Sequence, residues 1–218
     1  MDRSITVTGH AEVKKEPELA YMNLTVSAHE LTAKVAQETQ SQLMSAVLAT
    51  LDKLGVPAKA RKTQNFRTQQ LTNYDQKKQK HVPNGFQTTQ SLLVTVEANE
   101  AEQVVGALGS MGEGVQLSIG FGLKNHDAET NEALCLAIEN AKQKATAMAI
   151  ACGATLGNVI SCQEGGGHRG GAPRAMAVAA SAEMGGGSAP ELPMGEIEIH
   201  AMVTMQFALN EQGGEVPA

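Results

Sequence analysis

Residues 127–152, followed directly by an alternating segment at 155–164, constrain the fold more than any other stretch. Within 127–152, apolar and small side chains recur at steps of three and four residues, which places them on one face of a helix. These residues are Leu134, Ile138, Ala141, Ala145, Met148 and Cys152. Asn125 or Asp127 can cap the start, and Gly153 can adopt the left-handed conformation that ends a helix. The pattern predicts one long helix whose small-residue face packs closely on a sheet.

Two alternating segments lie near the ends of the chain. Residues 4–13 place Ile5, Val7 and Gly9 on one side, which is typical of a strand. Residues 196–209 alternate more cleanly, with these side chains inward: Ile197, Ile199, Ala201, Val203, Met205 and Phe207. Because the last strand needs a partner, we expect it to pair with the first.

The middle of the chain, residues 19–123, reads strand, helix, strand, strand, helix, strand. The first helix begins between Ser27 and Thr32, and its apolar stripe is Leu43, Met44, Val47, Leu48, Leu51 and Leu54. Gly55 ends this helix. Capping-box spacing links Ser27 with Glu30 and, at the second helix, Asn99 with Glu102. Residues 59–74 and 86–98 form a long hairpin, in which Phe66 and Leu71 are the expected apolar anchors. This order is typical of a split βαβ plait.

We therefore expect an α+β fold with antiparallel sheets and helices packed on one face. A βαββαβ plait-like domain, residues 18–123, is inserted into a second α+β layer that joins the two chain ends. The second layer comprises residues 1–17 and 124–218 and contains the long helix, 127–152. Residues 165–195 are rich in Gly, Ala, Ser and Pro, which predicts a flexible loop with too little apolar mass to pack.

Charge and hydropathy narrow the class of protein. The net charge of −6 argues against nucleic-acid binding, since neutralising phosphates needs a basic face. No apolar run of about 18 residues or more predicts a transmembrane helix. Met1 leads straight into the first strand without a signal-peptide core, so we expect either a cytoplasmic protein or a chain whose leader has been removed. Three cysteines without a CxxC pair do not indicate a disulfide framework.

No motif for catalysis or for binding a cofactor or metal is complete, so we predict no residues of these three kinds. Residues 165–171 resemble a phosphate-binding loop but lack its GK[ST] ending and its helix. The six histidines lack zinc spacing. His10 and His200 lie on the two terminal strands and could meet across a sheet, although solvent-facing positions are the safer interpretation.

Sulfur-containing residues leave a second possibility open. Cys152 lies on the predicted core face of the long helix with Cys135 beside it, as expected of inert buried thiols. An exposed thiol of low pKa, by contrast, could sense oxidants; Cys162 has no fixed basic neighbour in sequence. Soft Cu(I) binding by His168 with nearby methionines is the corresponding metal hypothesis. These methionines are Met176, Met184 and Met194.

Basic residues concentrate in the hairpin of an otherwise acidic chain: Lys59, Arg61, Lys62, Arg67, Lys77, Lys78 and Lys80. One interpretation is a solvated hairpin. The other is an attachment surface for an acidic partner or another subunit, because an exposed hairpin with polar edges is suited to self-assembly. We expect a homo-oligomer formed through hairpin 60–97.

Short segments along almost the whole chain resemble the SIMPL domain family. They are Ile5-Thr6-Val7-Thr8-Gly9, Leu51-Asp52-Lys53-Leu54-Gly55-Val56, Ile119-Gly120-Phe121-Gly122-Leu123, Ala141-Lys142-Gln143-Lys144-Ala145, Gly153-Ala154-Thr155-Leu156-Gly157 and Gly195-Glu196-Ile197-Glu198-Ile199. The resemblance implies an α+β envelope protein that is periplasmic or peripherally associated with the outer membrane. It also implies a link to stress tolerance, a tendency to form oligomers, and no cofactor.

Three functional hypotheses follow. The first is a non-enzymatic assembly or binding protein of the cell envelope. The second is a thiol- or metal-based protein of oxidative-stress defence. The third is an enzyme with its site in a cleft between the two layers, which would require converging titratable groups.

Overall fold

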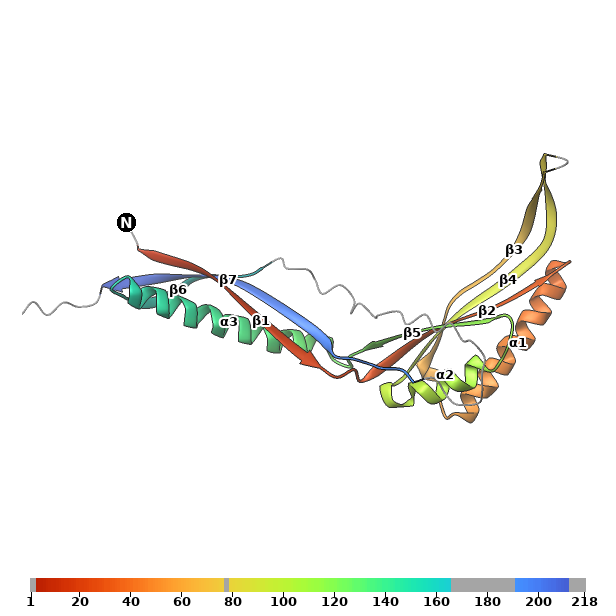
Figure 1. The fold of residues 1–218 in the computed structure, drawn as a ribbon, viewed down its shortest axis with the longest axis horizontal. Coiled ribbons are helices and arrows are strands. Elements are labelled where there is room, and N and C mark those ends of the chain that lie inside the picture. Colours follow the sequence, from red (N-terminus) through yellow and green to blue (C-terminus); the bar gives the residue numbers. More distant parts are fainter. Residues whose placement is uncertain (1–2, 77–78, 166–190, 212–218) are drawn as a thin grey trace, which may run out of the picture. The chain divides into compact units, whose positions relative to one another are not determined.

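The computed structural model describes residues 3–76, 79–165 and 191–211. The chain divides into two compact units. We call the first the terminal unit; it comprises Met1–Glu16, Leu123–Pro173 and Glu196–Ala218. The second, the plait unit, comprises Pro17–Gly122 and Arg174–Gly195. Both contain helices on antiparallel sheets (Figure 1), which confirms the predicted α+β class.

The terminal unit is a three-stranded sheet with one long helix along one face. Its elements are β1 (Ser4–Lys15), α3 (His126–Ala151), β6 (Ala154–Glu164) and β7 (Ile197–Glu211). The strand order is β1-β7-β6, and β1 pairs with β7 without a break from Ser4↔Ala208 to Lys15↔Ile197. The predicted pairing of the two ends of the chain is confirmed.

The face that α3 buries differs from the predicted stripe. Five alanines at steps of four are buried: Ala133, Ala137, Ala141, Ala145 and Ala149. Leu134 and Ile138 flank this row and are partly buried, whereas Met148 is 47% exposed and Cys152 is also exposed. The prediction for Met148 and Cys152 was therefore wrong. It followed the larger side chains, but α3 lies so close to the sheet that only alanine fits beneath it.

The plait unit is a four-stranded antiparallel sheet in the order β3-β4-β2-β5, with α1 and α2 on one face (Figure 1). Its elements are β2 (Leu19–Glu30), α1 (Ala33–Lys53), η1 (Ala58–Ala60), β3 (Arg61–Asp75), β4 (Lys80–Glu97), η2 (Ala98–Glu100), α2 (Ala101–Gly109) and β5 (Val115–Gly122). Alternate residues of β2 and β4 enclose a core with the apolar stripe of α1. Met44, Val47 and Leu51 are buried there, as their spacing predicts. Gly55 follows α1 with φ of +76°, in agreement with its predicted role as a helix stop.

Both predicted capping boxes are wrong. Ser27 lies within β2, because pairing with β4 extends that strand to Glu30, and Thr32 caps α1 instead. Asn99 lies in the short 3-10 turn η2, and α2 begins after it without a side-chain cap. In each case tertiary strand pairing or a preceding turn displaced a helix start that local sequence favoured. Phe66, a predicted anchor, is 53% exposed.

Of the predicted flexible loop 165–195, the structure describes residue 165 and residues 191–195. Residues 166–190, including His168, Met176 and Met184, lie outside the described residues. Within 191–195, Leu192 is only 6% exposed and belongs to the core of the plait unit. The expectation that nothing in this loop packs was therefore wrong for Leu192. No helix in the described part of the chain is long and apolar enough to cross a membrane.

Candidate assembly surface on the β3–β4 hairpin

The β3–β4 hairpin is the longest antiparallel pairing of the plait unit, and part of it has no third strand beside it in the described part of the chain. Among the described residues, β3 pairs only with β4, from Arg61↔Val94 to Asp75↔Lys80, and no described strand lies along its other backbone edge. β2 accompanies β4 only as far as Glu30↔Phe86. Residues 71–75 and 80–85 therefore form a ribbon of two strands. Because such a ribbon is only marginally stable in water, it is a natural place for a partner to bind.

Polar side chains fasten the base of the hairpin to α1. Gln37 of α1 donates to Thr68 Oγ1 at 3.2 Å, and Thr68 in turn contacts the buried Thr88 hydroxyl at 3.0 Å. Gln40, fully buried, donates to Gln90 Oε1 at 3.2 Å. These bonds hold the hairpin base in one orientation, because the amides and hydroxyls require defined directions.

Arg61 secures the point where the hairpin begins. Its guanidinium donates to Asp52 Oδ1 at 2.6 Å, and also to the backbone carbonyl of Val56. The Arg61 side chain is 9% exposed, so its guanidinium binds groups within the fold and is not accessible to a partner. Arg61 is therefore excluded from the predicted basic attachment surface.

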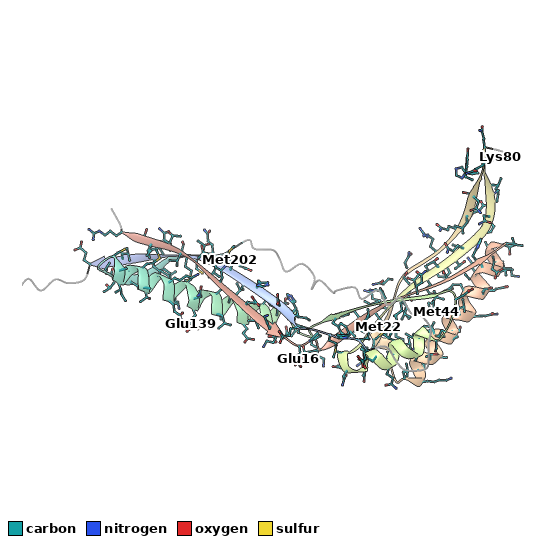
Figure 2. All side chains as sticks on the ribbon, viewed as in Figure 1. Glu16, Met22, Met44, Lys80, Glu139 and Met202 are labelled. Carbon is teal, nitrogen blue, oxygen red and sulfur yellow. The ribbon has the colours of Figure 1, made fainter. Side chains whose placement is uncertain are left out.

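Beyond the base, the hairpin exposes aromatic rings. Tyr74 is 56% exposed and lies opposite His81 in the strand register, with ring centroids 5.3 Å apart at an angle of 65°. Phe66, also exposed, lies closer to the base. Figure 2 shows Lys80 at the far end of the ribbon. Exposed aromatics beside a positive charge are typical of protein interfaces.

The charge of this region contrasts with that of the remaining chain. Residues 59–96 contain seven Lys or Arg and one Asp, which leaves ten basic and 22 acidic residues elsewhere. Lys77 and Lys78 lie outside the described residues. At the hairpin base, a shallow depression of about 410 Å³ is lined by Lys59, Ala60, Lys62, Leu93 and Thr95. The surface is thus basic with a small apolar floor, which suits an acidic partner.

The terminal unit shows where the two strand histidines lie. His10 and His200 are both exposed on the sheet face opposite α3. The register places Glu12, not His10, opposite His200. His200 lies 3.9 Å from Glu12 and 3.7 Å from Glu198, and Lys14 bridges the same two carboxylates. The hydrogen bonds and charges of Glu198 and Glu12 raise the pKa of Lys14. The interpretation of these histidines as solvent-facing is confirmed.

The helix pattern predicted buried thiols for Cys152 and Cys135, and that prediction was wrong. Cys135, Cys152 and Cys162 are all exposed. Within residues 3–76, 79–165 and 191–211, no group of three or more His, Cys, Asp or Glu side chains is arranged to hold a metal ion. The other cavity of note, about 140 Å³ in the plait unit, has one carboxylate among its lining residues, Glu102.

Comparison with known proteins identifies the family. Residues 5–207 match the SIMPL family, described as a protein of unknown function (DUF541). The chain belongs to the SIMPL family. This SIMPL protein is also 29% identical over 164 residues to the 26 kDa periplasmic immunogenic proteins of Brucella melitensis biotype 1 and Brucella abortus strain S19. Each match covers 73% of this SIMPL protein and 66% of the relative, just under two thirds of the relative's length.

Proposed function

We propose that this chain is a non-enzymatic SIMPL-type protein of the bacterial periplasm that self-associates through the β3–β4 hairpin. The periplasmic part is supported by the names of the two Brucella relatives. The self-association part is supported by one observation: residues 71–75 and 80–85 form a two-stranded ribbon, and no described strand pairs with the other edge of β3. Its partner is the acidic surface of a second copy, because the hairpin is the one strongly basic segment of the chain.

The test shortens the hairpin at a matched pair of residues. Because Gln70 lies opposite Phe86, residues 71–85 can be replaced by an Asn-Gly turn that closes the remaining strands. We expect the intact protein to form oligomers in sedimentation experiments and the shortened protein to be smaller in stoichiometry. Circular dichroism of both proteins checks that the plait core still folds.

A charge-reversal experiment provides the matched control. Lys62→Glu with Arg67→Glu should weaken association, because both side chains are exposed on the hairpin. Lys34→Glu changes an exposed lysine on α1 and should leave association unchanged. A strictly monomeric intact protein at high concentration, or oligomers indifferent to the shortened hairpin, would contradict the proposal.

A thiol-based role in oxidative-stress defence is the second candidate, favoured by the exposure of all three cysteines. Peroxide survival of a strain lacking this gene distinguishes the two. If assembly protects, the shortened-hairpin protein fails to restore survival, whereas a protein with all three cysteines changed to serine restores it. The reverse pattern supports the thiol role.

A further inference from the structure

The outer edge of β1 carries backbone groups that do not pair with β7. Among the described strands of the terminal unit, β1 lies at one edge of the order β1-β7-β6. Leu209 N–H donates to Arg3 O at 2.9 Å, and the register continues along β1 without a break. Because backbone groups alternate in direction along an antiparallel strand, odd-numbered residues point theirs toward β7 and even-numbered residues point theirs outward. Thr8 and His10 are therefore outward-pointing positions.

Two side chains of α3 bind these outward groups. Lys144 Nζ donates to Thr8 O at 2.9 Å, and His10 N–H donates to Asn140 Oδ1 at 3.2 Å. Asn140 and Lys144 are four residues apart, so they lie on the same side of α3. Four residues of a helix advance by roughly 6 Å and two residues of a strand by roughly 7 Å, so the helix side chains match the spacing of the strand positions.

Two further features keep this side of α3 along the edge of β1. Lys15 Nζ lies 2.9 Å from Glu132, which precedes Asn140 by two steps of four residues. Gly9 lies between the two bound positions, and a Cβ there would overlap the Ala137 carbonyl oxygen. The helix therefore comes close enough to β1 for its side chains to reach over the strand to the outer edge.

The part of β1 that these side chains cover is suited to pairing with a copy of itself. Residues 4–11 contain no Asp, Glu, Lys, Arg or Pro, and they include four consecutive β-branched residues, Ile5 to Thr8. Residues 12–15, by contrast, include Glu12, Lys14 and Lys15, and charges on an edge strand discourage pairing with another chain. The side chains of α3 thus cover β1 where its own charges end.

We propose that Asn140 and Lys144 form an edge guard, which prevents β1 from pairing with β1 of a second copy of the chain. A strand added at this edge needs the Thr8 carbonyl and the His10 N–H for its own ladder, and both groups are already bound. Displacement of the two side chains would expose these groups within an uncharged segment that favours strand addition. The edge guard lies wholly in the terminal unit and is independent of self-association through the hairpin.

Removal of the edge guard in the full-length protein tests the proposal. Asn140→Ala with Lys144→Ala removes one amide and one ammonium group. Lys142→Ala with Gln143→Ala is the matched control, because it removes the same two kinds of group from exposed positions of α3. In dilute solution, hydrogen exchange at the His10 amide should become faster by about tenfold or more without the guard, since its hydrogen bond is lost, and should stay unchanged in the control.

A series of protein concentrations separates guarding from simple support of the fold. As concentration rises, the variant without the guard should sediment as a larger species than wild type. The outward amides of Thr6, Thr8, His10 and Glu12 should regain protection, because they enter a new ladder. Sedimentation like that of wild type with exchange independent of concentration would overturn the proposal. So would equal association of the control, or larger species in which these amides stay unprotected.

A synthetic peptide of residues 4–14 provides a second readout. It should bind the variant without the guard at least about tenfold more tightly than it binds wild type, as measured by fluorescence anisotropy, because two backbone groups become available to it. Equal affinities would overturn the proposal. Should the double variant fail to fold by circular dichroism, Asn140→Ala alone is measured in the same two assays and decides.

Discussion

Changing Gly9 to Ala tests the close approach of α3 to β1. A Cβ built at Gly9 would lie 2.0 Å from the Ala137 carbonyl oxygen and 2.8 Å from the Ala141 Cβ. The carbonyl belongs to the helix backbone, so no side-chain rotation relieves the clash. Relief requires α3 to move away from β1 by roughly an ångström, given ordinary van der Waals separations.

Such a movement has consequences that can be estimated. It loosens the contacts of the alanine row and lengthens two hydrogen bonds between β1 and α3. Lys144 Nζ donates to Thr8 O at 2.9 Å, and His10 N–H donates to Asn140 Oδ1 at 3.2 Å. Overpacking and these two bonds together should lower the free energy of unfolding by about 3 kcal/mol or more. The intrinsic effect has the opposite sign, because replacing a strand glycine with alanine is by itself favourable by roughly 0.5–1 kcal/mol.

Hydrogen exchange identifies which unit responds. With Gly9→Ala, amides of α3 such as Ala141 should lose protection while Val104 in the plait unit keeps it. The melting transition of the terminal unit should fall by about 6 °C or more. Gly109→Ala is the matched control: it adds the same methyl group at the end of α2, where no heavy atom lies within 4 Å, and should be neutral or slightly stabilising. Equal stability of Gly9→Ala and wild type would refute the argument that close approach excludes every side chain there.

Three further predictions concern other parts of the chain. Leu51→Asp should lower the free energy of unfolding by about 4 kcal/mol or more in urea titrations, because a charge enters a fully buried site, whereas Leu31→Asp, at an 87% exposed site, should have little effect. Lys15 holds the pKa of Glu132 below its ordinary value, so the carboxylate stabilises the fold above its unfolded-state pKa and loses that effect as pH falls through its folded-state pKa. The difference in melting temperature between wild type and Glu132→Gln should therefore be present at pH 7 and vanish in acid; a constant difference would contradict it. A disulfide reagent should react in the native state with the exposed thiols of Cys135, Cys152 and Cys162. If these thiols reacted only after unfolding, that result would contradict their exposure.

The basic hairpin shows how far a candidate site follows from sequence. The cluster of Lys and Arg, and the alternation of Leu92, Val94 and Val96, predict a charged hairpin with one apolar face, and these three side chains are buried. The role of Arg61 could not be predicted from the sequence. Its partners Asp52 and Val56 lie before the hairpin, and they reach Arg61 only because the chain reverses direction between α1 and β3. Nor could the unaccompanied ribbon be predicted, since its length depends on where β2 stops pairing with β4.

Leu192 and the cysteines illustrate the opposite limit. A single leucine in a segment rich in Gly, Ala, Ser and Pro has no periodicity, so no pattern predicts that it is buried. Cys152 falls on an apolar stripe by spacing, yet it caps the C-terminus of α3 and is exposed. Helical spacing specifies a face, but it does not specify how far along that face the packed partner extends.

The sequence by itself determined the order of strands and helices, the inward side of each regular strand and the end of α1 at Gly55. These follow from local steric rules and from the period of apolar side chains, which act on neighbours in the chain. Only the tertiary structure decided which stripe of α3 is buried, how far the hairpin extends beyond β2 and that Leu192 joins the plait core. Each of these depends on distances between segments far apart in the sequence: Gly9 admits the alanines of α3 because neither surface has a side chain large enough to hold them apart.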